Sequence, residues 1–218
     1  MLSAKSQPEL PTLRGRLHVW AFYLAIPTGI VVGLLADGGK AHVAAAIYGG
    51  TVVTMFGASA LYHRILWRPR IRPWIRRLDH AMIFTLIAGT YTPFGLIVLH
   101  GAWRISILAI VWGGATVAIV VKLFWVDAPK WVAAVIGLAL GWAGVAILPQ
   151  LATRLDPAAV ALLGAGGVAY TAGAITYAWR RPNPVPAVFG YHELFHALTI
   201  VGVACQYVAI AFFIVHAG

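Results

Sequence analysis

Seven long apolar stretches, joined by short polar connections, constrain the fold of this 218-residue chain more than any other feature. A hydrocarbon core about 30 Å thick is crossed by roughly twenty apolar helical residues. Windows of that length predict seven membrane-spanning helices, at 18–36, 42–63, 79–99, 103–124, 130–150, 157–179 and 190–216. Hydrophobic residues make up 61% of the chain, which is more apolar surface than a soluble domain of this size can bury. The sequence therefore predicts an all-α integral membrane protein.

The division of the chain follows from these stretches. All connections between them are short, so residues 18–217 are predicted to form a single seven-helix membrane domain. Residues 1–17 are polar and contain two prolines, which predicts a separate N-terminal segment and no cleavable apolar leader. The single cysteine, Cys205, lies in an apolar stretch and excludes both a disulfide within the chain and a cysteine-rich metal site.

The cationic residues are distributed unevenly over the connections. When the connections are assigned alternately to two sides, thirteen of the sixteen Lys and Arg residues fall on the side of the N-terminus. The other side receives only Lys40, Arg104 and Arg154. Cytoplasmic connections carry such an excess of positive charge. We therefore predict a multi-pass protein of the bacterial inner membrane, with its N-terminus in the cytoplasm and its C-terminus outside.

The connection from Arg64 to Arg77 concentrates this charge and also contains Trp67 and Trp74. Basic residues interleaved with aromatic ones occur in nucleic-acid-binding surfaces. Here, however, the segment is short and lies between two spans, where basic residues set topology and attract anionic headgroups. We expect membrane lipids as partners of this connection and no nucleic acid.

Four ionisable residues are predicted to lie at one depth in the membrane. His192 and His196 stand four residues apart at the start of the last span, on one face of a helix. His63 ends the second span and Asp79 begins the third. The topology, which used only Lys and Arg, places all four near the cytoplasmic face. Such residues are costly in lipid unless they have a partner, so three distant segments are predicted to meet around one group.

The residue types point to zinc. Catalytic zinc sites use three protein ligands and keep a fourth position for water. His192 and His196 present two imidazoles from one helix, and His63 would supply the third ligand. Asp79 would bind the ion directly or hydrogen-bond its water. Ser59 shares a helix face with His63 and would steady the water or an oxyanion, so Asp79 and Ser59 are the predicted catalytic residues.

Other polar residues near the span ends have simpler interpretations. Four histidines are interpreted as polar side chains at the membrane interface: His18, His42, His100 and His216. His80 is expected to point away from the partners of Asp79, because neighbours on a helix diverge by about 100°. Glu193 is expected to stabilise the start of its helix in preference to acting as a base.

Two features of the spans predict helix geometry. The unit Tyr91-Thr92-Pro93 predicts a kink in the third span. Glycines at 137, 141 and 144, and at 164, 166 and 167, predict small-residue surfaces for close packing between helices.

Three blocks of this sequence resemble the signatures of the haemolysin III family, the bacterial members of the progestin and adiponectin receptor group. They are Ser59-x3-His63, the segment Arg77-Leu78-Asp79-His80 continuing to Thr92-Pro93, and His192-Glu193-Leu194-Phe195-His196. The resemblance covers essentially the whole chain. It implies seven helices in the orientation opposite to that of G-protein-coupled receptors. It also implies a zinc ion near the cytoplasmic face, held by the matches of His63, His192 and His196, with the Asp79 match contacting a zinc-bound water.

The wider superfamily, which includes alkaline ceramidases, is similar in this Ser, His, Asp and His-x3-His set and implies hydrolysis of lipid amides. This chain departs from many relatives in lacking a further histidine near Cys205-Gln206, which bears on the polarity around the site and not on the proposed ligands. The family name reflects a haemolytic phenotype, and nothing in these residues explains how a helical bundle would lyse a cell.

Several functions are compatible with these residues. The preferred hypothesis is a zinc-dependent intramembrane hydrolase of a lipid amide or ester, and the alternative is a non-enzymatic membrane sensor or regulator with structural zinc. A haem protein with two histidine ligands is disfavoured by the pair on one helix. A pore or transporter would show further buried charges along a path. A retinal protein would need a lysine in the last span, which has none.

Overall fold

The computed structural model describes residues 11–216, and all the long elements in this range are helices. The helices are α1 (Arg16–Leu34), α2 (Gly39–Arg64), α3 (Arg72–Pro93), α4 (Gly101–Phe124), α5 (Lys130–Gly141), α6 (Leu148–Arg154), α7 (Pro157–Trp179) and α8 (Tyr191–Ala209). Together with the helical turns that extend them, they form seven elements long and apolar enough to cross a membrane. The predicted fold class of seven helices is confirmed.

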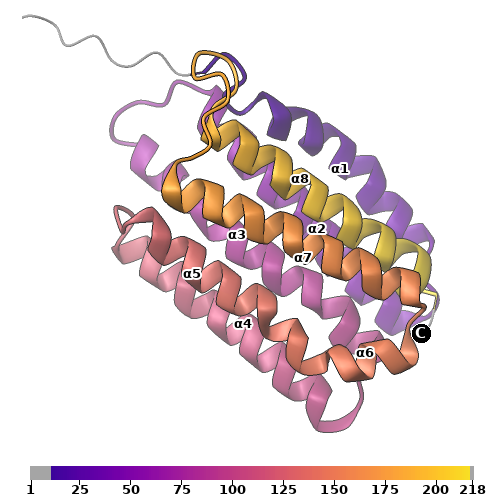
Figure 1. The fold of residues 1–218 in the computed structure, drawn as a ribbon. Coiled ribbons are helices and arrows are strands. Elements are labelled where there is room, and N and C mark those ends of the chain that lie inside the picture. The colour runs from indigo at the N-terminus through magenta and orange to yellow at the C-terminus, as the bar shows by residue number, and fades with distance from the viewer. Residues whose placement is uncertain (1–10, 217–218) are drawn as a thin grey trace, which may run out of the picture.

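The helices run side by side along a common direction, as Figure 1 shows. Around the bundle α1 packs on α2, α2 on α3, α3 on α4, α4 on α5, α5 on α7 and α7 on α8, and α8 returns to α1. The first and last spans are therefore neighbours. This closure brings the start of α8 beside the end of α2, so residues far apart in the sequence meet at one end of the bundle, called here the histidine end.

The third helix begins earlier than its apolar stretch. We predicted a start at residue 79, but α3 begins at Arg72 and includes Arg76 and Arg77 in its first two turns. These arginines were expected in the connection between two spans. The guanidinium of Arg77 lies 5.0 Å from the Trp74 ring centroid and Arg76 pairs with Asp127 at 2.6 Å. Long cationic side chains with such partners allow a helix to continue beyond the hydrocarbon region.

The fifth span is interrupted where a tyrosine side chain from α3 forms hydrogen bonds with its backbone. Between α5 and α6 the chain forms a 3₁₀ helix, Trp142–Ile147. The Tyr91 hydroxyl of α3 donates to the Gly141 carbonyl at 2.5 Å and accepts from the Gly144 amide at 2.7 Å. A side chain inserted into the helical ladder in this way is a common cause of an irregular turn. A π-helical turn, Phe94–Val98, follows Pro93, the last residue of α3, and so comes directly after the unit in which the kink was predicted.

Candidate metal centre

Local hydrogen bonds determine where α8 starts, and with it the position of two histidines. Gly190 precedes the helix, and its amide donates to Glu193 Oε2 at 3.0 Å. Asn183 Oδ1 accepts a hydrogen bond from the Tyr191 amide at 2.9 Å. A side chain that reaches back to the first amides satisfies donors that have no partner within the helix. Glu193 therefore stabilises the helix start, as expected, and is fully buried.

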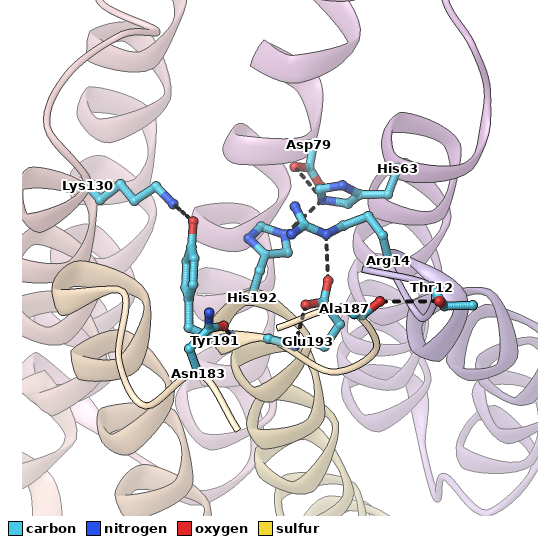
Figure 2. Close-up of polar contacts among 11 residues, drawn as sticks. Thr12, Arg14, His63, Asp79, Lys130, Asn183, Ala187, Tyr191, His192 and Glu193 are labelled. Carbon is cyan, nitrogen blue, oxygen red and sulfur yellow. Dashed lines mark hydrogen bonds and ion pairs between the residues drawn. The ribbon is translucent and has the colours of Figure 1, made fainter. Parts of the chain in front are cut away.

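Three histidines converge at this end of the bundle. His192 and His196 occupy the first two turns of α8 and His63 lies one residue before the end of α2. One ring nitrogen from each of the three lies within 4.8 Å of the others. Figure 2 shows His63 and His192 pointing toward one another, with 3.2 Å between their Nε2 atoms. The structure thus brings together the three residues predicted as metal ligands.

One pair of this donor set has the spacing of ligands in a tetrahedral zinc site. Zinc–nitrogen bonds of about 2.0–2.1 Å in tetrahedral geometry separate two ligand atoms by roughly 3.3 Å, close to the distance between His63 Nε2 and His192 Nε2. His196 is 2% exposed, and its Nδ1 atom is buried without a hydrogen-bond partner among residues 11–216. Buried imidazole nitrogens that face one another in this way can hold a metal ion.

A buried carboxylate lies beside the cluster. Asp79, on the second turn of α3, is 8% exposed, and its Oδ2 atom is 3.8 Å from His63 Nε2. Ser59, one turn before His63 on α2, is also buried. Its Oγ atom lies 2.8 Å from His18 Nδ1. The structure thus places Asp79 directly against a predicted ligand, whereas Ser59 contacts a histidine that sequence reasoning assigned elsewhere.

His18 is the residue that the sequence interpretation missed. We expected a polar side chain at the membrane interface, but His18 is 2% exposed. Its ring stacks on His196, with centroids 3.7 Å apart and planes inclined by 11°. The signal was present in the sequence: His18 starts the first span and so lies at the same predicted depth as His63, Asp79 and His192. The interpretation of His18 as an interfacial residue is therefore wrong.

The other three histidines of that group lie at the opposite end of the bundle. His42 is near the start of α2, His100 precedes α4 and His216 follows α8, and all three are exposed. They make contacts with nearby residues, such as the one between His42 Nδ1 and the Gly38 carbonyl at 2.8 Å. Their positions agree with the interfacial interpretation.

The segment before α1 covers the histidine end. The amides of Thr12 and Leu13 donate to the carbonyls of Ala187 and Val188 at 3.0 and 3.1 Å, which ties this segment to the connection before α8. Arg14 Nε donates to Glu193 Oε1 at 2.5 Å (Figure 2). The chain therefore closes over the cluster, and a charge-assisted hydrogen bond of this kind is among the stronger ones in proteins.

Gly15 allows the covering segment to lie directly on His63. Its φ angle is +73°, a conformation that residues with a Cβ rarely adopt. A Cβ atom added at this position would lie 2.5 Å from the Cβ of His63. The absence of a side chain therefore sets how closely the start of α1 approaches the face of α2 that carries His63.

Comparison with known proteins agrees with this arrangement. A family model described as "Haemolysin-III related" matches residues 7–207. The chain belongs to this family. It is 31% identical over 169 residues to the "Hemolysin-3 homolog" of Bacillus subtilis (strain 168), which covers 78% of this chain and 76% of that protein. It is also 31% identical over 194 residues to the "Hemolysin-3" of Bacillus cereus, across 88% of this chain and 85% of the relative.

Membership of the haemolysin III family covers nearly the whole bundle, including every residue of the cluster. With seven helices able to cross a membrane, this haemolysin III protein is a multi-pass membrane protein. Its buried histidines could hold a metal ion. The resemblance seen in the three sequence blocks is confirmed at the level of the family.

Proposed function

We propose that this haemolysin III protein is a zinc-dependent hydrolase that acts within the membrane on a lipid amide or ester. The observation that carries the proposal is the convergence of three histidine nitrogens within 4.8 Å, with the buried Asp79 carboxylate 3.8 Å from one of them. Buried acid–base groups that converge on one point are a feature of active sites more than of structural helix contacts.

Zinc suits the three imidazoles because it accepts nitrogen ligands and keeps a fourth position open in catalytic sites. When bound, a zinc ion supplies Lewis acidity, which polarises a carbonyl and makes water a better nucleophile near neutral pH. His63, His192 and His196 would hold it. Their rings come from two helices and are oriented by the packing described above.

The remaining groups would handle protons and charge. Asp79 Oδ2 would take up the proton of the attacking water and return it to the leaving nitrogen or oxygen of the substrate, so that one water is consumed and an acid and an amine or alcohol are released. The Ser59 hydroxyl would donate to the oxyanion. Ser59 Oγ lies 2.8 Å from His18 Nδ1. When Nδ1 is protonated it donates to Ser59 Oγ, and the Ser59 hydroxyl hydrogen is then free to donate to the oxyanion.

The test is hydrolysis by purified protein reconstituted in lipid. N-acyl lipid amides and matching esters are offered, and released fatty acid is measured by mass spectrometry. We expect turnover that is lost after chelation and restored by zinc. Stoichiometric zinc without turnover on any substrate of the panel would contradict the hydrolase and favour the second candidate.

That second candidate is a non-enzymatic sensor or regulator in which zinc has a structural role. It is favoured by one observation: His63 and His192 are 129 positions apart in the chain, so an ion between them would join α2 to α8. A metal that binds only the folded protein stabilises it. Under this alternative, chelation lowers thermal stability but no substrate is consumed.

We further propose that the histidine end faces the cytoplasm of a bacterial inner membrane. Arg64, Arg68 and Arg70 are exposed at that end, where they would contact anionic lipid headgroups and not nucleic acid. Single cysteines in a Cys205→Ser background test the orientation. In intact spheroplasts, Arg70→Cys is expected to resist a membrane-impermeant maleimide, whereas Gly38→Cys at the other end is expected to react. The reverse pattern would overturn this orientation.

A further inference from the structure

The first and last spans are joined at the histidine end by two contacts that follow one another along the helices. Arg14, just before α1, bonds to Glu193 in the first turn of α8 (Figure 2). Four residues after Arg14 and three after Glu193, the His18 ring stacks on that of His196. Glu193 and His196 lie on one face of α8, so the two contacts together fix the register between the spans. His18 is thereby placed against a predicted metal ligand, although it is not one of the three histidines whose nitrogens converge.

The stack on His18 restrains the plane of the His196 ring. The two centroids are 3.7 Å apart and the planes are inclined by 11°, so the rings lie face to face. The rings of His63, His192 and Phe195 are inclined to His196 by 65°, 59° and 55°. A rotation of the His196 ring about its Cβ–Cγ bond would therefore drive it into the His18 ring.

A hydrogen bond at Nδ1 does not supply this restraint. A histidine that binds a metal is usually oriented by a hydrogen bond from its second ring nitrogen. His196 Nδ1 is buried and has no such partner among residues 11–216. The parallel ring of His18 is therefore the contact that sets the orientation of His196.

His18 is itself held by two residues of α2. Its Nδ1 atom lies 2.8 Å from Ser59 Oγ, and the Phe56 ring meets it edge-on with centroids 5.1 Å apart. Its other nitrogen, Nε2, is buried without a partner in the range that the structure describes. A buried nitrogen without a partner is costly, so an apolar ring would fill this place at lower cost. The contact with Ser59, which fixes the rotation of the ring, gives a reason for a histidine here.

We propose that His18 is a positioning residue of the metal centre: its ring, anchored by Ser59, holds His196 in the orientation in which it binds the ion. The inference rests on the zinc site of the proposed function. It does not rest on hydrolysis, because it concerns how tightly the ion is bound. It also gives Ser59 a second role, that of raising zinc affinity through His18.

The zinc affinity of purified full-length protein, measured by competition with a chromogenic chelator, tests this role. His18→Leu removes both the flat ring and the contact with Ser59. It is expected to weaken zinc binding roughly 10- to 100-fold, the range found for groups that orient a metal-binding histidine. His18→Phe keeps a flat ring without the anchor, and its affinity is expected to lie between those of His18→Leu and the wild type.

Phe22→Leu is the matched control, because it also replaces an aromatic ring of α1 by leucine. Phe22 lies one turn after His18 and packs on Gly57 of α2. Its replacement is expected to leave zinc affinity unchanged. The visible absorption of cobalt(II) at saturation, which reports the geometry of the ligands, is expected to change in His18→Leu and not in Phe22→Leu.

A double-mutant cycle tests the anchor. Ser59→Ala is expected to weaken zinc binding roughly 2- to 10-fold, the value of one hydrogen bond. In a His18→Phe background the same change is expected to have no further effect, since no Nδ1 atom remains to be held. A role of Ser59 confined to the oxyanion predicts instead that Ser59→Ala binds zinc as the wild type does, and that result would overturn the anchor.

Unchanged zinc affinity in His18→Leu would overturn the proposal, and so would an equal loss in Phe22→Leu. A wild type that binds neither zinc nor cobalt would refute the metal centre together with this role of His18. Absence of turnover in the zinc-loaded wild type would refute the hydrolase alone, because the affinities still decide the role of His18. If His18→Leu does not fold, His18→Phe and Ser59→Ala decide it, and wild-type affinity in both would overturn the proposal.

Discussion

Replacement of Asp79 by asparagine is expected to slow lipid-amide hydrolysis by roughly 10²- to 10⁴-fold, the contribution typical of general acid–base catalysis. The Asp79 carboxylate is buried, and its Oδ2 atom lies 3.8 Å from His63 Nε2. Asparagine has nearly the same shape and can still hydrogen-bond water, but it cannot take up a proton. The rate constant kcat is measured beside the zinc content of the same preparation, which is expected to match that of the wild type.

Asp127→Asn is the matched control for this substitution. Asp127 lies at the same end of the bundle, but its side chain is 79% exposed and pairs with Arg76. Its replacement is expected to leave kcat unchanged. Full activity of Asp79→Asn would show that Asp79 is not the base, whereas loss of zinc together with activity would make Asp79 a metal ligand.

The seven spans could be predicted from the sequence because lipid leaves the backbone no alternative to helix at that length. The first residue of α3 could not be predicted from hydropathy in the same way. Hydropathy detects the part of a helix that lies in hydrocarbon, whereas α3 begins at Arg72 among arginines that extend past it. The apolar stretch thus gave a minimum length for this helix.

The 3₁₀ turn that interrupts the fifth span could not be predicted from the sequence, for a different reason. It depends on the Tyr91 hydroxyl, which bonds to the backbone of Gly141 and Gly144 some fifty positions later. No local pattern records such a contact. The close packing predicted at Gly141 is wrong for a similar reason, because an added Cβ there would have no neighbour within 4 Å. A glycine looks the same in a sequence whether the space beside it holds another helix or is open.

The clustering of the histidines was largely predictable because depth is a strong constraint in a membrane. The distribution of Lys and Arg placed His63, Asp79, His192 and His196 at one end, and the structure brings them together there. Applied to every histidine, the same argument would have included His18. His18 falls outside the predicted cluster because a single histidine at a span end is more simply interpreted as a polar side chain at the interface.

Replacement of His63 by alanine is expected to reduce bound zinc from about one ion per chain to near none, because two remaining imidazoles leave a tetrahedral ion without its third protein ligand. His63 Nε2 is 3.2 Å from His192 Nε2, so its removal opens the centre of the cluster. The measurement is elemental analysis of protein purified without added chelator.

His42→Ala is the matched control, since His42 lies at the opposite end of the same helix, exposed to its surroundings. It is expected to retain the zinc content of the wild type. Full zinc occupancy in His63→Ala would contradict the site as described.

Thermal stability supplies an independent readout of the same ion. A ligand that binds only the folded state stabilises it by about 4 kcal/mol at a free concentration roughly 1,000 times its Kd. The Tm of the wild type is therefore expected to fall on chelation. The Tm of His63→Ala is expected to be lower from the start and insensitive to the chelator, since no ion remains to join α2 to α8. A chelator-sensitive Tm in that variant would mean that the stabilising metal is bound elsewhere in the protein.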